Sequence, residues 1–378
     1  LDEFHERSIH TDLALALLRE IQTTVRPELR IIVMSATIDP EPIAEYLGGA
    51  SVHQSEGRLH PVEIDYLPRA DQRPVWEKAA GAVRRLAGES RDGHILVFLP
   101  GIGEIRRTGE LLADFPAEKH VLHSSISAEE QDRALAPSAQ RKLVLATNIA
   151  ETSITIDGVT TVVDSGLARI LVNDPRLGID RLEVRRISRA SAKQRAGRAG
   201  RTAPGCCLRL WTRLEDAALE ETNAPEIQRI DLAATLLALR AYGVRDPRQF
   251  NWYEAPRPEN LVRAEELLRL LGAIDADGLI TGLGRKIAAV PLHPRIGRLL
   301  IEGTEEGLLE DAATLAAILS ERDILTHTRP HGPQWQTTSD LLDRMDLLEG
   351  RTGSQQTDRR ALANVERVRR DLIDIARR

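Results

Sequence analysis

The sequence predicts a parallel α/β fold over its first part and a mainly helical fold after residue 220. Short apolar runs such as 95–99 and 143–146 alternate with helical stretches, which is typical of a parallel sheet covered on both faces. From residue 220 onward, apolar residues recur at helical spacing, as in 231–242 and 260–271. A chain of 378 residues is long enough for two to four domains.

Residues 1–56 predict the end of a first α/β unit. A helix is expected over 12–22, and a short buried strand over 31–34 would deliver Ser35 and Thr37 at its carboxyl end, where open α/β sheets bind ligands. The sequence contains no Gly-Lys dipeptide and therefore no G-x-x-x-x-G-K-[ST] phosphate-binding loop. We expect the chain to be a fragment whose first domain lacks its N-terminal half.

Residues 57–219 predict a second α/β unit. Its expected elements are a helix over 104–115 and four strands, at 95–99, near 121, at 143–146 and at 162–163. Between 168 and 187 the pattern changes to that of a β-hairpin with a polar turn at 173–178. A purely structural hairpin stays open as the alternative to a functional one.

The remaining residues predict two helical parts. After the helices at 231–242 and 260–271, two short apolar runs around the turn 275–278 predict a two-stranded wing. Four further helices are expected, at 296–301, 312–319, 341–348 and 361–375. The loop 326–336 contains His327 and His331, which we interpret as part of a polar loop rather than a metal site.

Charge and cysteine content narrow the class of protein. The net charge of −6 argues against general nucleic-acid binding, but residues 181–213 hold ten basic side chains and one acidic one, Glu183. The adjacent Cys206 and Cys207 are unsuited to a disulfide or a four-ligand metal site, so we expect them in a strand core. No apolar run is long enough to span a membrane, and we expect a cytoplasmic protein.

An arginine-rich stretch at 194–201 is the strongest candidate for chemistry. If a helix begins at Ser191, then Gln194, Arg198 and Arg201 lie on one helical face. Gly197 and Gly200 leave room for a ligand or a second backbone. Two planar, permanently charged guanidiniums suit a triphosphate. The alternative is a disordered Arg/Gly tail, which the flanking apolar runs disfavour.

Four segments, in this order, resemble motifs of the superfamily 2 helicases in their DEAH-box form. They are residues 2–7 (motif II), 35–37 (motif III), 146–156 (motif V) and 194–201 (motif VI). The resemblance is closest to the bacterial HrpB-type subgroup, which Phe4 also fits. It implies a RecA-like (P-loop NTPase-type) remnant over 1–56, a second RecA-like domain over 57–219 with the hairpin 168–187, a winged-helix domain over 220–290 and an incomplete helicase-associated bundle over 291–378.

The resemblance also implies ATP and Mg²⁺. Asp2 would hold the metal ion through water, and Glu3 would position and activate the attacking water. His5 would link the nucleotide site to Gln194 or to the motif III turn, where Ser35 and Thr37 would act in coupling. Arg198 and Arg201 would approach the γ-phosphate from the other α/β unit, so the site would form between two domains. Further contacts are implied to phosphate and ribose (Ser153 and Asp157) and to the nucleic-acid backbone (Ser124 and Thr147).

We therefore expect an ATP-dependent helicase or translocase acting on single-stranded or partly duplex RNA, with DNA as the alternative. Aromatic residues make up 3% of the chain, which disfavours a base-stacking platform and favours backbone contacts. Two other functions stay open. One is an ATPase that remodels RNA–protein complexes without processive unwinding. The other is an inactive nucleic-acid-binding module, against which Glu3, Arg198 and Arg201 argue.

Overall fold

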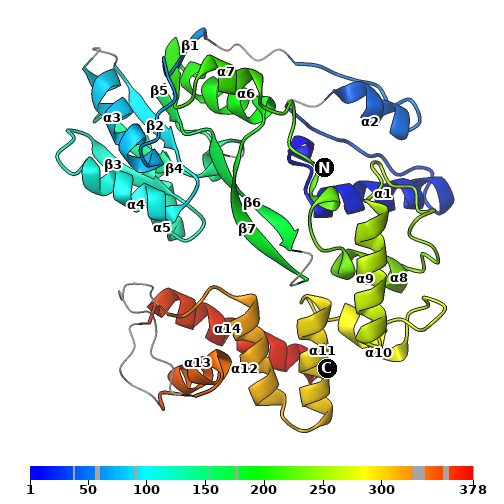
Figure 1. The fold of residues 1–378 in the computed structure, drawn as a ribbon. Coiled ribbons are helices and arrows are strands. Elements are labelled where there is room, and N and C mark those ends of the chain that lie inside the picture. The colour runs from blue at the N-terminus through cyan, green and yellow to red at the C-terminus, as the bar shows by residue number, and fades with distance from the viewer. Residues whose placement is uncertain are drawn as a thin grey trace. The chain divides into compact units, whose positions relative to one another are not determined.

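The structure is a computed structural model that describes residues 1–36, 39–55, 60–88, 92–152, 154–174, 178–325, 337–351 and 357–377 (Figure 1). It divides into two compact units, Leu1–Ile230 and Asp231–Arg378. The finer division into four domains remains a prediction. Within the described ranges, every helix is too short or too polar to cross a membrane.

A six-stranded parallel sheet forms the centre of the first unit, in the order β1-β8-β5-β2-β4-β3. Its strands are β1 (Val62–Tyr66), β2 (His94–Phe98), β3 (Glu118–Leu122), β4 (Lys142–Ala146), β5 (Val159–Asp164) and β8 (Gly205–Arg209). Strands β2, β4 and β8 are buried along their whole length. Such strands read as continuous apolar runs, which is why the sequence predicts β2 and β4 correctly.

Helices cover both faces of this sheet, as predicted (Figure 1). One face packs against α3 (Val75–Ala87) and α4 (Ile102–Leu111), and the other against α5 (Ala128–Leu135) and α6 (Arg189–Gly197). Cys206 belongs to the first core and Cys207 to the second, because neighbours on a strand point to opposite faces. Both thiols are free and buried, which confirms their predicted place in a strand core.

The predicted hairpin is confirmed. Strands β6 (Leu167–Asp174) and β7 (Ile179–Arg186) pair antiparallel along their full length, from Leu167 with Arg186 to Asp174 with Ile179. Residues 175–177 of the expected turn lie outside the described residues.

Residues 1–50 contain the 3₁₀ turn η1 (Phe4–Glu6), α1 (Ile9–Thr24) and α2 (Pro40–Tyr46). The helix predicted at 12–22 is confirmed and extends further at both ends. The buried strand predicted at 31–34 is wrong, because Ile32 is 70% and Met34 50% exposed. This run pairs on one side with residues 1–4, where Met34 N donates to Leu1 O at 2.8 Å and Phe4 N to Met34 O at 3.0 Å. No further strand of the described residues covers it, so Ile32 and Met34 stay exposed while Ile31 and Val33 are half-buried.

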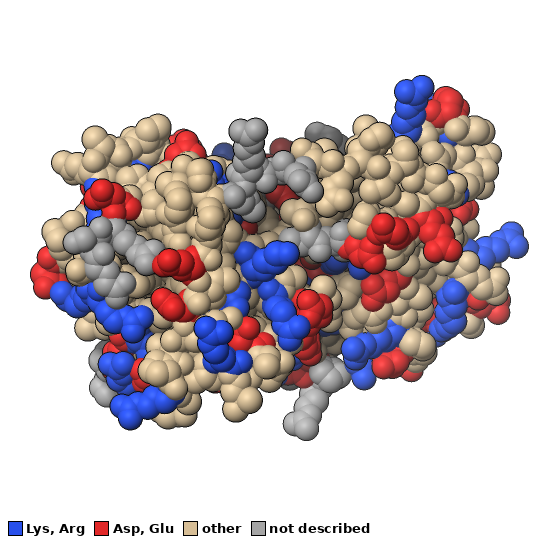
Figure 2. Space-filling view, turned by 90° about the horizontal axis from the view of Figure 1, so that it is seen from above, with Lys and Arg blue, Asp and Glu red and all other residues tan. Residues whose placement is uncertain are grey.

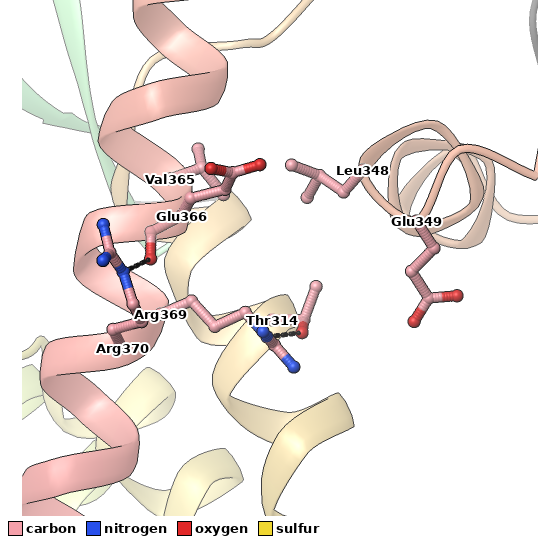
Figure 3. Close-up of a pocket in the computed structure, with 7 residues that line it drawn as sticks. All are labelled: Thr314, Leu348, Glu349, Val365, Glu366, Arg369 and Arg370. Carbon is pink, nitrogen blue, oxygen red and sulfur yellow. Dashed lines mark hydrogen bonds between the residues drawn. The ribbon is translucent and has the colours of Figure 1, made fainter.

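The second unit is helical, as predicted. It contains α8 (Ala233–Tyr242), α9 (Pro258–Leu270), α10 (Gly282–Ala288), α11 (Pro294–Glu305), α12 (Leu309–Ser320), α13 (Asp340–Leu348) and α14 (Arg359–Ala376). The expected two-stranded wing is reduced to one antiparallel bridge, between Ile274 and Ile280. A surface pocket of about 490 Å³ is lined by residues of α12, α13 and α14, including Thr314, Leu348 and Arg369 (Figure 3). The histidine loop 326–336 lies outside the described residues.

Candidate active site

The motif II segment is a single anchored turn preceded by two carboxylates, the exposed Asp2 and the half-buried Glu3. Phe4 is fully buried and fixes the turn. Glu3 and Arg7, on either side of it, adopt left-handed backbone angles, with φ of 48° and 49°. Such angles cost a non-glycine residue about 1–3 kcal/mol and are retained where the surrounding structure holds them. The exposed Asp2 accepts the Glu3 N–H at 2.8 Å. The turn therefore fixes the backbone that carries the Asp2 and Glu3 carboxylates.

His5 connects this turn to motif III. Its Nδ1 accepts the Ala36 N–H at 3.3 Å, and its Nε2 lies 3.5 Å from the Glu3 carboxylate. The side chain is only 6% exposed. Of the two partners implied for His5, the structure shows the motif III turn. Ser35 is exposed there, and Thr37 lies outside the described residues.

Motif VI does not form one continuous α-helix. Helix α6 begins at Arg189, after the Ser188 hydroxyl that accepts the Ser191 N–H, and it ends at Gly197. Arg198 instead opens the 3₁₀ turn η3 (Arg198–Gly200). The expected helix from Ser191 through Arg201 is therefore wrong. A Cβ on Gly200 would lie 2.6 Å from the His60 carbonyl oxygen, so this glycine lets η3 pack directly against the chain before β1.

Arg198 is buried against the motif V loop. Its Nε donates to Glu151 O at 2.9 Å, its Nη2 to Thr152 O at 2.5 Å, and its Nη1 to Ile154 O. Burial and the neighbouring Arg201 lower the pKa of Arg198 to about 10, although Glu151 and Glu3 act in the opposite direction. The guanidinium therefore stays charged at neutral pH. Glu3 of motif II is close enough to act on the pKa of this motif VI arginine.

Arg201 differs from Arg198 in its exposure. Its guanidinium is exposed, and its Nη1 donates to the Thr155 hydroxyl. Gly197, one turn earlier, faces open space, because a Cβ there would meet no atom within 4 Å. Arg201 and Gly197 thus leave a side of motif VI accessible to a ligand.

Motifs II and V are also in direct contact. The Thr152 hydroxyl donates a hydrogen bond to the Glu6 carboxylate. Ser153 lies outside the described residues, and Asp157 is exposed. The structure therefore brings the motif II turn, the motif V loop and the two arginines together, while the roles implied for Ser153 and Asp157 stay predictions. Gln194 is half-buried on α6, and its role also stays a prediction.

The residues implied in nucleic-acid contact follow two neighbouring strands. Ser124 comes after β3 and is exposed, whereas Thr147 comes directly after β4 and is 8% exposed. Because β3 and β4 are parallel neighbours, both residues lie at the same edge of the sheet. This arrangement fits the predicted role, which no contact in the structure tests.

A buried ion-pair network that the sequence analysis did not predict lies beneath this site. Arg195 is 1% exposed, and its guanidinium donates to the Glu151 carboxylate at 2.9 Å and to the Asp164 carboxylate at 3.0 Å. Full burial raises the pKa of Asp164, although Arg195 and the Gly166 N–H stabilise its charged form. The sequence signal for the burial of Arg195 was its helical spacing from two small residues, Ala192 and Ala199, which are both buried. Arg195 therefore points into the sheet rather than toward a ligand.

The positive charge of residues 181–213 is partly offset by neighbouring carboxylates. Six of its ten basic side chains pair with carboxylates, namely Arg181, Arg185, Arg186, Arg189, Arg195 and Arg209. On the face drawn in Figure 2, basic and acidic side chains are intermixed. The local excess of positive charge is therefore modest.

Three parts of the chain match domain families that occur in helicases. Residues 78–203 match the helicase conserved C-terminal domain. Residues 264–292 match the winged-helix part of the helicase-associated domain HA2, and residues 293–372 match its ratchet-like part. The chain thus carries the RecA-like C-terminal domain of a helicase followed by a helicase-associated domain, which confirms the resemblance to DEAH-box helicases and the predicted fold class.

Individual relatives make the resemblance more specific. The chain is 41% identical over 367 residues to the ATP-dependent RNA helicase HrpB of Escherichia coli, covering 94% of this chain and 45% of that protein. It is 38% identical over 381 residues to the pre-mRNA-splicing factor ATP-dependent RNA helicase prp22 of Schizosaccharomyces pombe, covering 97% and 31%. The crystal structure of the Escherichia coli DEAH/RHA helicase HrpB superposes with a TM-score of 0.84 at 35% identity, covering 100% and 45%. The chain spans less than half the length of these relatives.

Proposed function

We propose that this protein is an ATP-dependent helicase or translocase that couples ATP hydrolysis to movement on, or unwinding of, RNA in the cytoplasm. One observation carries the proposal. The motif II turn is hydrogen-bonded to the motif V loop through Glu6 and Thr152, and carbonyl oxygens of the same loop bind Arg198 of motif VI, near the exposed Arg201. Carboxylates and arginines gathered around one loop match the needs of phosphoanhydride hydrolysis. The relatives named as ATP-dependent RNA helicases support ATP and RNA as the substrates.

The residues present fit a magnesium ion. In the described part of the chain, no three His, Cys, Asp or Glu side chains form a metal-binding cluster. Mg²⁺ does not need one, because it keeps several waters and takes other ligands from substrate phosphates. The exposed Asp2 carboxylate would hold the hydrated ion. When bound, the ion would supply positive charge that offsets the charge on the β- and γ-phosphates.

The protein residues would then divide the work. Glu3 would orient the attacking water and accept its proton. Arg201 would contact the γ-phosphate, where an arginine finger contributes about 10³ to 10⁵ in rate. Arg198 would hold the motif V loop by binding the carbonyl oxygens of that loop, so that the loop and Arg201 would move together. The hairpin β6–β7 and the residues Ser124 and Thr147 would contact single-stranded or partly duplex RNA through its backbone, with DNA as the alternative.

ATP hydrolysis with and without single-stranded RNA tests the proposal, in a longer version of the protein that includes the expected phosphate-binding loop. RNA should stimulate turnover, and a partial RNA duplex should be separated. Glu3→Gln should lower turnover at least about a hundredfold, in the range typical of general-base loss, while RNA still binds. Glu28→Gln, which removes a surface partner of Arg26, serves as the matched control. Turnover without duplex separation would favour the remodelling ATPase, and absence of turnover would favour the inactive binding module.

A further inference from the structure

A short segment links the motif II turn to the hairpin. It comprises residues 224–230, includes the 3₁₀ turn η4 (Glu226–Gln228) and is anchored by Ile227, which is fully buried. We call it the η4 segment. It belongs to neither the sheet nor motifs II, III, V and VI, yet two of its side chains bond to regions far away in the sequence.

Glu226 binds the end of motif II. Its N–H donates to Arg7 O at 3.0 Å, and its carboxylate accepts the Ile9 N–H at 3.0 Å. Ile9 opens α1, and the first N–H groups of a helix have no partner within the helix. A carboxylate placed there also interacts favourably with the helix dipole. Glu226 therefore fixes the point where the motif II turn becomes α1.

Arg229 binds the hairpin. Its carbonyl oxygen accepts the Asn173 N–H at 2.7 Å, and its Nη1 donates to Leu171 O. Both partners are backbone groups of β6. Edge strands present such groups unpaired, so a protein segment can bond to them. Burial lowers the pKa of Arg229, with Glu226 acting in the opposite direction.

The two side chains also bond to each other. The Arg229 Nη2 lies 3.4 Å from the Glu226 carboxylate, and the Arg229 Nε donates to Ala224 O at 3.2 Å. One guanidinium thus joins β6, the η4 segment and Glu226, and Glu226 continues to Arg7 and Ile9. The result is a continuous hydrogen-bonded connection from the motif II turn to the hairpin.

We propose that Glu226 and Arg229 are positioning residues that transmit movement of the motif II turn to the hairpin, an inference that rests on the proposed function. When nucleotide draws motif II toward motif VI, Glu226 moves with Arg7 and Ile9. Arg229 then shifts β6 along with it. The pair acts on the coupling between hydrolysis and strand separation, and it does not touch the reacting groups.

The first test measures coupling in the longer protein. Glu226→Ala and Arg229→Ala should each keep RNA-stimulated ATP turnover within about twofold and lower the duplex separated per ATP at least about fivefold, the lower end of typical coupling between sites. Arg229→Lys, which keeps the charge but not the fork of donors, should fall between Arg229→Ala and the wild type. The double variant should lose no more than either single one, because both residues belong to one connection.

Two matched variants serve as controls. Arg84→Ala removes a guanidinium that binds a carbonyl, Leu111 O, and a carboxylate, Asp114, as Arg229 does, but between α3 and α4. Glu130→Ala removes a carboxylate that accepts the Ser127 N–H at the start of α5. Neither should change the duplex separated per ATP. An equal loss in these controls, or unchanged coupling in the Glu226 and Arg229 variants, would overturn the proposal.

The second test needs no activity and is done on residues 1–378. Amide hydrogen exchange at Ile9 should become faster in Arg229→Ala, although Arg229 does not bond to Ile9, while amides of β2 and β4 keep their protection as a check on folding. Unchanged exchange at Ile9 would overturn the connection. If the wild type lacks RNA-stimulated turnover, the proposed function fails, and the exchange result still decides whether the connection exists.

Discussion

At the scale of single residues, three arginines of one short segment have three different environments. Arg195 is buried between two carboxylates, Arg198 is buried among carbonyl oxygens, and Arg201 is exposed. The side-chain chemistry is identical, so the environment alone decides what each can do. Only Arg201 is accessible enough to act as an arginine finger without first breaking several hydrogen bonds.

Arg201→Ala in the longer protein should lower kcat for ATP at least about a hundredfold, since arginine fingers contribute about 10³ to 10⁵. RNA affinity should change little, because the guanidinium serves the nucleotide. Steady-state phosphate release and an RNA-binding titration measure the two effects. Arg189→Ala, which removes a surface pair with Glu221, is the control on the same segment. Near-normal turnover in the Arg201 variant would refute the site between two domains.

Arg195→Ala should instead destabilise the fold. Removing this guanidinium leaves the Glu151 and Asp164 carboxylates in the interior without the cation that lies between them, which costs about 3–5 kcal/mol. Urea unfolding of residues 1–378, followed by circular dichroism, measures the change in the free energy of unfolding. Arg189→Ala should cost no more than about 1 kcal/mol, as is usual for an exposed pair. Equal stabilities of the two variants would show that the network contributes little.

At the scale of elements, close approach of backbones shapes the site as much as side chains do. Turn η3 lies directly against the residues before β1 because Gly200 has no Cβ. Strand β1 itself was not predicted, because it is an edge strand whose central residues are exposed and its sequence lacks a continuous apolar run. Sequence patterns report burial, and an edge strand held by its neighbour's backbone gives little signal.

Two glycines of motif VI provide a matched pair of variants. Gly200→Ala should destabilise the first unit by about 1–3 kcal/mol, the usual cost of overpacking, because the new methyl group meets the His60 carbonyl and Val62. Gly197→Ala should leave stability unchanged or slightly higher, since the added methyl group meets open space. Thermal unfolding compares the two. If nucleotide occupies the space beside Gly197, that variant should still bind ATP more weakly.

The hairpin β6–β7 should act in strand separation rather than hydrolysis. Replacing residues 176–181 by a short Gly/Ser turn should spare RNA-stimulated ATP turnover and impair unwinding, because the described part of this stretch pairs within the hairpin, as Asp180 does with Asn173 and Arg181 with Asp174 and Glu183. Unwinding of a fluorescent partial duplex measures the loss. Arg181→Ala alone, which breaks surface pairs with Asp174 and Glu183, is the control. Unwinding that survives the replacement would leave the hairpin a purely structural element.

At the scale of the whole molecule, the order of the elements was more predictable than their contacts. The alternation of apolar runs with helical stretches predicted the parallel sheet correctly. The helical spacing of apolar residues after residue 220 predicted the helical second unit correctly. The strand expected at 31–34 fails because a pattern cannot show whether a second neighbour covers it. The strong positive charge expected for residues 181–213 is partly offset, because their carboxylate partners include Glu215, Asp216 and Glu221, which lie beyond residue 213. Partners distant in sequence leave no local signal.

Residues 1–378 alone should not hydrolyse ATP measurably. A phosphate-binding loop anchors the β- and γ-phosphates through backbone N–H groups and a lysine, and these residues contain no such sequence. The chain should still bind single-stranded RNA weakly through residues 181–213, with affinity that falls as salt rises. Phosphate release with and without RNA, and RNA titrations at two salt concentrations, measure both. Magnesium-dependent turnover would reveal an unrecognised nucleotide site.

The adjacent cysteines of β8 give this chain a built-in pair of reporters. They are its only two thiols, and each lies in a different core, one on either side of the sheet. Burial raises the pKa of Cys207, which disfavours its reactive thiolate while that side of the sheet stays closed. With one cysteine replaced by serine, the rate at which the other cysteine is labelled measures how fast the helical layer on its side of the sheet loosens. The two layers can thus be followed separately without adding any foreign label site.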